Sequence, residues 1–210
     1  MMELEDIDRI HKLFPVEIMQ FKCPDEVIDK ALELLYDEEL GLHNFPNTVY
    51  TSRGDLHTRP EWNEVTQFIQ QCLNRWMVNY RLQCDELSVS LMWGVFSKAR
   101  EGGCHPMHRH SMSAVCGVLY LTDGTPLVIH DPVTSRNWDT LEIMREDGWY
   151  PEVEIAAKRG KLVLFPGWLL HGSRGNDRDT ERWAVSFNSL PTGDVNNTAQ
   201  DYPMARIKVS

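Results

Sequence analysis

The sequence predicts an α+β protein in which helices pack against an antiparallel sandwich of β-strands. Up to about residue 83, apolar residues recur at the spacing of three and four that forms one face of a helix. From Leu87 onward, apolar and polar residues alternate in short runs, and glycine-containing turns separate these runs. Helices first and short strands afterwards are typical of this fold class.

Two helices are expected in the N-terminal part. The first opens at Pro24, where a missing N–H does no harm, and lasts until Gly41. The second begins near Pro60, after a turn-rich connector over residues 44–55. The apolar faces of the two helices comprise Val27, Ile28, Ala31, Leu34 and Leu35 in the first, and Trp62, Val65, Phe68, Ile69, Leu73 and Trp76 in the second.

Five strands are expected after the helices. Residues 131–151 between the third and fourth strands are polar and show no period, so we expect a long loop, of a length that is often functional. The expected strands are Leu87–Phe96, Ala114–Leu121, Pro126–His130, Lys161–Phe165 and Trp183–Phe187.

Composition excludes several classes of function. A chain of 210 residues fits one domain, and its net charge of −10 disfavours general binding to nucleic acid or to anionic membrane. The acidic first residues lack the pattern of a signal peptide, and no apolar stretch approaches a membrane span of about 20 residues. Five scattered cysteines without a CxxC pair indicate reduced thiols. We therefore expect a cytoplasmic protein.

Three histidines stand out as candidate metal ligands. His108 and His110 are two residues apart, so on an extended strand they share one face. His171 follows the apolar run 163–170 and needs a partner if it is buried. Solvated histidines on a surface strand are the alternative for the first pair, but the three together favour a metal site.

The residue types leave the metal open. Imidazoles suit iron, zinc, copper or nickel, and a three-histidine zinc centre is chemically sound. The usual oxygenase triad has two histidines and a carboxylate, and His110 occupies the position where we expect that carboxylate. Three neutral ligands would leave the metal with one more positive charge, which strengthens its hold on an anionic cosubstrate. Asp131 could supply a carboxylate instead.

Arg182 lies eleven residues beyond His171 and is a candidate anchor for a dicarboxylate cosubstrate. Guanidinium recognition of a carboxylate is strong and geometrically selective. Alternation puts Ser186 on the same side of the strand, where its hydroxyl could add a contact. A surface ion pair with Glu181, Asp177 or Asp179 is the alternative for this arginine.

Three segments together resemble the 2OG-Fe(II) oxygenase family. The run HPMHRHSMSAVCGVLYL at 105–121 is similar to its HxH and SGVYYL segment. GKLVLFPGWLLH at 160–171 is similar to its G-x-L-x-L-F-P-S-x-L-x-H segment, and RWAVSFN at 182–188 to its R-x-x-x-S-F-N end. Departures are Cys116 and Gly167, where the family usually has serine, and His105 near a usual asparagine.

The resemblance implies a double-stranded β-helix, which is a jelly-roll, cupin-like barrel. The barrel would occupy residues 86–190, with a mainly helical part over 1–85 packed against it and a C-terminal tail over 191–210. It implies Fe(II), 2-oxoglutarate and O2 as reactants, with hydroxylation of a substrate and release of succinate and CO2. The implied site residues are the metal ligands His108, His110 and His171, and the cosubstrate contacts Arg182, Ser186 and Tyr120.

Two other functions fit the same residues. A three-histidine dioxygenase or cupin-like enzyme would not use 2-oxoglutarate and would not need Arg182. A non-catalytic jelly-roll module would hold zinc, or would keep its histidines for structure. The sequence does not indicate which small molecule or peptide is the primary substrate. An exposed sheet edge could pair two copies into a homodimer.

Overall fold

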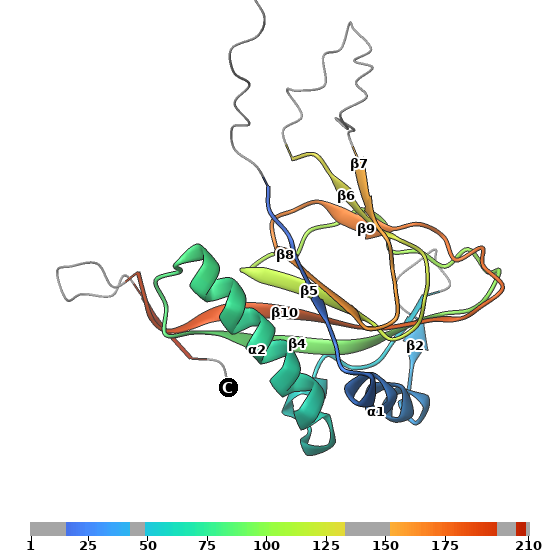
Figure 1. Ribbon diagram of the computed structural model, residues 1–210, viewed down its shortest axis with the longest axis horizontal. Helices are drawn as coiled ribbons and strands as arrows, with labels where there is room; N and C mark the ends of the chain where they lie inside the picture. The colour runs from blue at the N-terminus through green and yellow to red at the C-terminus, as the bar shows by residue number, and fades with distance from the viewer. Residues whose placement is uncertain (1–15, 43–48, 133–151, 197–204, 209–210) are drawn as a thin grey trace, which may run out of the picture.

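The computed structural model describes residues 16–42, 49–132, 152–196 and 205–208. Two antiparallel sheets form the body of the protein, and the helices lie on one side of the larger sheet (Figure 1). The helices are α1 (Asp25–Tyr36) and α2 (Asn63–Tyr80), with 3-10 turns η1 (Leu56–Thr58) and η2 (Pro60–Trp62) before α2. The strands are β1 (Met19–Lys22), β2 (Gly41–Leu42), β3 (Val49–Thr51), β4 (Glu86–Ser97), β5 (Val115–Tyr120), β6 (Leu127–His130), β7 (Glu152–Ile155), β8 (Lys161–Pro166), β9 (His171–Ser173), β10 (Arg182–Val195) and β11 (Ala205–Ile207).

The larger sheet has the strand order β1-β8-β5-β10-β4-β3-β2, and β11 pairs with the far end of β10. The smaller sheet has the order β7-β6-β9. β10 is central because it pairs with β4 on one side and β5 on the other. Two sheets of this kind around a shared core are the jelly-roll arrangement, and the predicted α+β class is confirmed.

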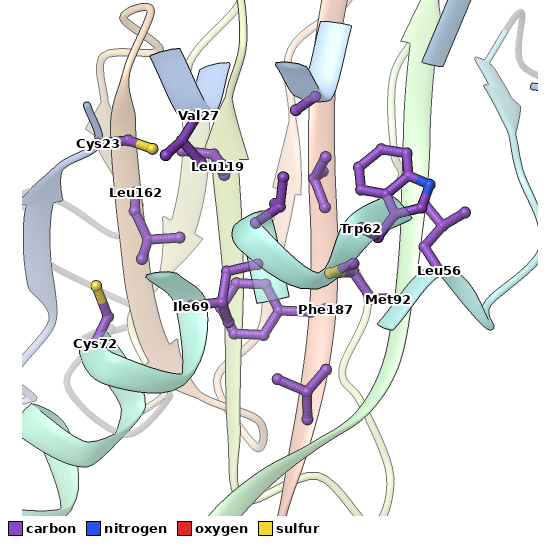
Figure 2. Close-up of a cluster of buried hydrophobic side chains, with 14 of the residues drawn as sticks. Cys23, Val27, Leu56, Trp62, Ile69, Cys72, Met92, Leu119, Leu162 and Phe187 are labelled. Carbon is purple, nitrogen blue, oxygen red and sulfur yellow. The ribbon is translucent and has the colours of Figure 1, made fainter. Parts of the chain in front are cut away.

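One apolar core lies between the helices and the larger sheet (Figure 2). Trp62 and Ile69 pack there against Met92 and Phe187, and all four are fully buried. The predicted faces of both helices therefore point inward, because their apolar residues recur once per turn.

A second apolar core lies between the two sheets and ends at the histidines. Alternation along β10 sends Trp183, Val185 and Phe187 to the helix side, while Ala184 joins the core between the sheets. Arg182 lies on the same side of the strand as Ala184, so β10 carries it into the space between the sheets.

Gly117 in β5 is required by the packing of the helix-side core. A Cβ atom at this position would overlap the ring of Phe187 and a methyl group of Leu164. We expect Gly117→Ala to lower the free energy of unfolding by about 1–3 kcal/mol, as overpacking does. Gly41→Ala is the matched control, because a Cβ there meets nothing within 4 Å. Equal denaturation midpoints for the two variants would contradict this account.

The structure corrects several predicted elements. The part predicted as mainly helical also supplies β1, β2 and β3 to the larger sheet, and its first helix ends at Tyr36 rather than near Gly41. The residues predicted as a C-terminal tail include the end of β10 and all of β11, which pair with each other. β7 and β9 were also not predicted. Most of the predicted loop over 131–151 lies outside the described residues.

The two α-helices of the described residues include none that is both long and apolar enough to cross a bilayer.

Candidate active site

Three imidazoles converge between the two sheets. His108 and His110 come from the segment between β4 and β5, and His171 begins β9. Their ligand nitrogens all lie within 4.8 Å of one another. The Nε2 atoms of His108 and His110 are 3.2 Å apart, and the ring of His171 lies 4.5 Å from that of His108 between centroids.

Backbone pairing sets this convergence. His108 and His171 form an antiparallel bridge, with N–H to carbonyl distances of 2.8 and 3.0 Å. The N–H of His110 donates to the carbonyl of Gly167 at 3.1 Å. A Cβ at Gly167 would overlap the backbone of Ser113, so glycine is needed here for the close approach of the two segments.

Backbone carbonyls orient two of the rings. The Nδ1 of His108 lies 2.7 Å from the carbonyl of Pro106, and the Nδ1 of His171 lies 2.7 Å from that of Leu169. A carbonyl oxygen only accepts, so each Nδ1 carries the proton and each Nε2 keeps its lone pair. This is the usual outer support of a metal-binding histidine. The arrangement therefore fits a divalent metal.

Burial keeps two of these imidazoles neutral. Burial, together with the neighbouring histidines, lowers the pKa of His110 to about 4 and that of His171 to about 3. Neutral imidazole is the form that binds a metal, so the site is ready for one at pH 7.

We expect the metal-free protein to lose stability as the pH falls from 7 to 5. In the unfolded chain His110 and His171 regain an ordinary pKa near 6.5, so below that pH the unfolded state binds more protons than the folded state. The free energy of unfolding therefore decreases as the pH falls, until the pH approaches the pKa values that the two histidines have in the folded state. Urea denaturation in a chelator, repeated across this range, measures the effect. A slope equally steep in His171→Leu would contradict the assignment.

Arg182 is a buried cation without an anionic partner among the described residues. Only 4% of it is exposed, and it makes one hydrogen bond, from Nη1 to Thr125 Oγ1 at 3.3 Å. Its Nε has no hydrogen-bond partner in the part of the chain that the structure describes. Burial lowers its pKa, while the phenol of Tyr120 opposes that change. A guanidinium in this condition indicates a place for an anion.

The predicted site residues line one cavity of about 50 Å³. Ser186 and Tyr120 lie on its wall together with Arg182 and the three histidines, and burial raises the pKa of Tyr120 to about 12. Asp131 is not part of the metal-ligating group found among the described residues, whereas His105 lines the cavity without joining that group.

Two residues of the site have no signal in the sequence. Thr125, the hydrogen-bond partner of Arg182, lies in the connection before β6, where nothing in the pattern distinguishes it. Trp93 lines the cavity from β4, where the alternating pattern does not distinguish it from the other residues of the strand. The ion pairs suggested for Arg182 with Glu181, Asp177 or Asp179 do not form.

The part of the chain that contains the three histidines and Arg182 also matches a known protein family. Residues 91–188 match the family model described as "Putative 2OG-Fe(II) oxygenase". A search of curated proteins finds no match.

Solved structures with the same fold share little sequence with this chain. HygX from Streptomyces hygroscopicus, solved with nickel and 2-oxoglutarate bound, is 11% identical, with a TM-score of 0.60 over 93% of each chain. SnoK, a non-heme alpha ketoglutarate dependent carbocyclase from nogalamycin biosynthesis, is 14% identical, with a TM-score of 0.66 over 93% of this chain and 90% of SnoK. A Pseudomonas putida prolyl-4-hydroxylase is 16% identical, with a TM-score of 0.60 over 85% of this chain and 94% of the hydroxylase. At such identities the likeness shows the fold.

Proposed function

We propose that the chain, whose residues 91–188 match the 2OG-Fe(II) oxygenase family, belongs to that family, with His108, His110 and His171 holding Fe(II) and Arg182 binding 2-oxoglutarate. The protein is a 2-oxoglutarate- and Fe(II)-dependent dioxygenase that uses O2. We propose hydroxylation of a substrate C–H bond as its reaction, with succinate and CO2 released. Bound iron, 2-oxoglutarate and O2 supply the oxidation, and the chain supplies position and exclusion of water.

The observation that carries the proposal is the buried Arg182 beside three neutral imidazoles. Its Nε lacks a partner, and its Nη1 makes a long hydrogen bond. A dicarboxylate satisfies both ends of this cavity, because one carboxylate pairs with the guanidinium while the other end reaches the metal. Ser186 and Tyr120 line the same cavity and are proposed as further contacts of the cosubstrate.

The three histidines form an all-neutral ligand set. The Nε2 atoms of His108 and His110 are 3.2 Å apart, and the ligand atom of His171 lies within 4.8 Å of both. Lone pairs this close repel one another unless a cation or a proton lies between them. We propose that no protein carboxylate completes the set, since Asp131 lies outside the group. The negative charge near the metal then comes from 2-oxoglutarate.

A three-histidine dioxygenase without 2-oxoglutarate makes a different prediction about Arg182. Such an enzyme has no use for a buried guanidinium, which is costly to desolvate without an anionic partner. The unsatisfied Arg182 therefore favours the 2-oxoglutarate enzyme.

An anaerobic Fe(II) titration tests the proposal. We expect the weak visible charge-transfer band of a metal-chelated keto acid when Fe(II) and 2-oxoglutarate are both present, and no band with Fe(II) alone. Iron binding with no band in the presence of 2-oxoglutarate would favour the three-histidine dioxygenase. Absence of iron binding would leave a jelly-roll module without this chemistry.

A cytoplasmic location is proposed as well. All five cysteines are free thiols, and three of them are buried. Reduced thiols are typical of cytosolic proteins.

A further inference from the structure

A groove outside the metal cavity has the size of a binding site for an organic molecule. The metal cavity measures about 50 Å³, whereas the groove measures about 400 Å³ and so falls within the usual range for small-molecule sites. We call this space the outer groove, and it is lined by Ser90, Leu91, Ser111, Met112, Ser113, Asn188, Leu190 and Lys208.

The outer groove adjoins the proposed metal centre. Ser111 and Met112 directly follow the proposed ligand His110 in the chain. Cys116 lines the metal cavity, and its thiol lies 3.2 Å from Ser113 Oγ and 3.3 Å from Asn188 Oδ1, two atoms on the groove side. Cys116, which lines the metal cavity, therefore contacts two residues that line the groove.

Cys116 orients the amide of Asn188 towards the groove. The thiol is protonated, since burial raises the pKa of Cys116 to about 11, and its single S–H lies within reach of two acceptors, Ser113 Oγ and Asn188 Oδ1. We assign the proton to Asn188 Oδ1, because Ser113 Oγ already accepts from the N–H of Ser189. The Nδ2 group is thereby turned away from Cys116 and donates no hydrogen bond to a described residue. Asn188 is 8% exposed and lines the groove, so its Nδ2 is available to donate to a ligand there.

The charges around both spaces are positive. None of the described residues that line the metal cavity or the outer groove is Asp or Glu, although the chain has 31 such residues. Lys208 lines the groove and forms no ion pair with a described residue. In a protein with a net charge of −10, this local pattern favours an anionic ligand.

The proposed ligand set leaves the loaded cavity positive. Fe(II) and the guanidinium of Arg182 together carry three positive charges and the three imidazoles are neutral, so doubly charged 2-oxoglutarate leaves one net positive charge in the cavity. A carboxylate ligand from the protein would have cancelled that charge. A negative group in the neighbouring groove is attracted to this net positive charge.

We propose that the outer groove binds the primary substrate and that this substrate is an amphipathic carboxylate. Its carboxylate accepts from Asn188 Nδ2 and faces Lys208, while its apolar body lies on Leu91, Met112 and Leu190. Asn188 is the residue that determines specificity, and Cys116 positions it. The proposal rests on the proposed 2-oxoglutarate chemistry for the charge of the cavity.

Hexanoate and its neutral amide, hexanamide, are probes matched in shape. We expect hexanoate to bind at least about tenfold more tightly than hexanamide, because a hydrogen bond to a charged acceptor is stronger than one to a neutral acceptor. Calorimetric titration of anaerobic protein saturated with Fe(II) and 2-oxoglutarate measures the two affinities. The charge-transfer band should shift and persist, because the probe lies beside the cosubstrate. Loss of the band would mean that hexanoate displaces 2-oxoglutarate at Arg182, and that result would overturn the proposal.

Single substitutions distinguish how much each groove residue contributes to hexanoate binding. Asn188→Ala should weaken hexanoate about tenfold, and Lys208→Ala about threefold because this residue is exposed, with 2-oxoglutarate affinity unchanged in both. Arg206→Ala is the matched control, since Arg206 lies two residues from Lys208 but pairs with Asp194 outside the groove. It should bind hexanoate as the wild type does.

Substitution of Cys116 tests its positioning role. Cys116→Ser keeps a donor for Asn188 and should retain hexanoate affinity, whereas Cys116→Ala frees the amide to rotate and should weaken it. Equal affinity for hexanoate and hexanamide, or no loss in Asn188→Ala, would overturn the proposal. Failure of the oxygenase assignment is recognised separately, because then no band appears before any probe is added.

Discussion

Arg182→Met should greatly weaken 2-oxoglutarate binding and leave the ligand-free protein as stable as the wild type or more so. The methionine has nearly the volume of the arginine stem and carries no charge. Replacing a buried, poorly compensated ion with an apolar side chain is often neutral or stabilising, by up to a few kcal/mol. The two effects have opposite signs because the guanidinium is unsatisfied until an anion arrives.

The expected loss of 2-oxoglutarate affinity is at least about 100-fold, the order expected when one member of a buried charge pair is removed. Calorimetry with Co(II)-loaded protein measures it, and chemical denaturation of the ligand-free protein measures the stability. Arg100→Ala is the control, since Arg100 is an exposed arginine paired with Asp179. Retained 2-oxoglutarate binding in Arg182→Met would refute the anchor, and a large loss of stability would mean that the arginine serves the fold.

Much of the fold could be predicted because its long elements carry complete periods. α2 repeats its apolar stripe over 18 residues, and β4 alternates over 12. Strands such as β2 and β9 have two and three residues, too few for any period to be recognised. Their place in the sheets depends on tertiary pairing, which a single sequence does not contain.

The extent of β10 shows a second limit. Alternation was recognised only as far as Phe187, because a register shift follows Asn188 and the residues beyond it include a proline and a glycine. Pairing with β4 and β11 nevertheless keeps the strand extended to Val195. Local composition there indicates a turn, and partner strands override it.

The candidate site was predictable where motif and spacing coincide. The His108–His110 spacing placed two imidazoles on one side, the apolar run before His171 indicated the third, and alternation put Ser186 beside Arg182. The resemblance alone implied Tyr120. Neither source could indicate Thr125, because its contact with Arg182 exists only when the connection before β6 folds over β10.

His110→Ala should lose at least about 100-fold in metal affinity, more than a change in an outer-shell residue costs. Its nitrogen is one of three within 4.8 Å, and two imidazoles alone hold a divalent ion weakly. His105→Ala is the matched control, because His105 lines the same cavity with its ring 6.1 Å from that of His108 but is outside the group. It should keep its metal affinity within a few fold. Equal losses in the two variants would mean that His110 has no special role.

His110→Asp distinguishes the ligand role of this position from its packing role. A carboxylate at this position is a competent ligand, so Co(II) affinity should be recovered relative to His110→Ala. The added negative charge lies close to the metal and cancels one positive charge of the cavity, so 2-oxoglutarate should bind more weakly than in the wild type, by about tenfold. Calorimetric titration of the cobalt-loaded variant measures this. Recovery of the metal together with unchanged 2-oxoglutarate affinity would show that the neutral ligand set does not govern cosubstrate binding.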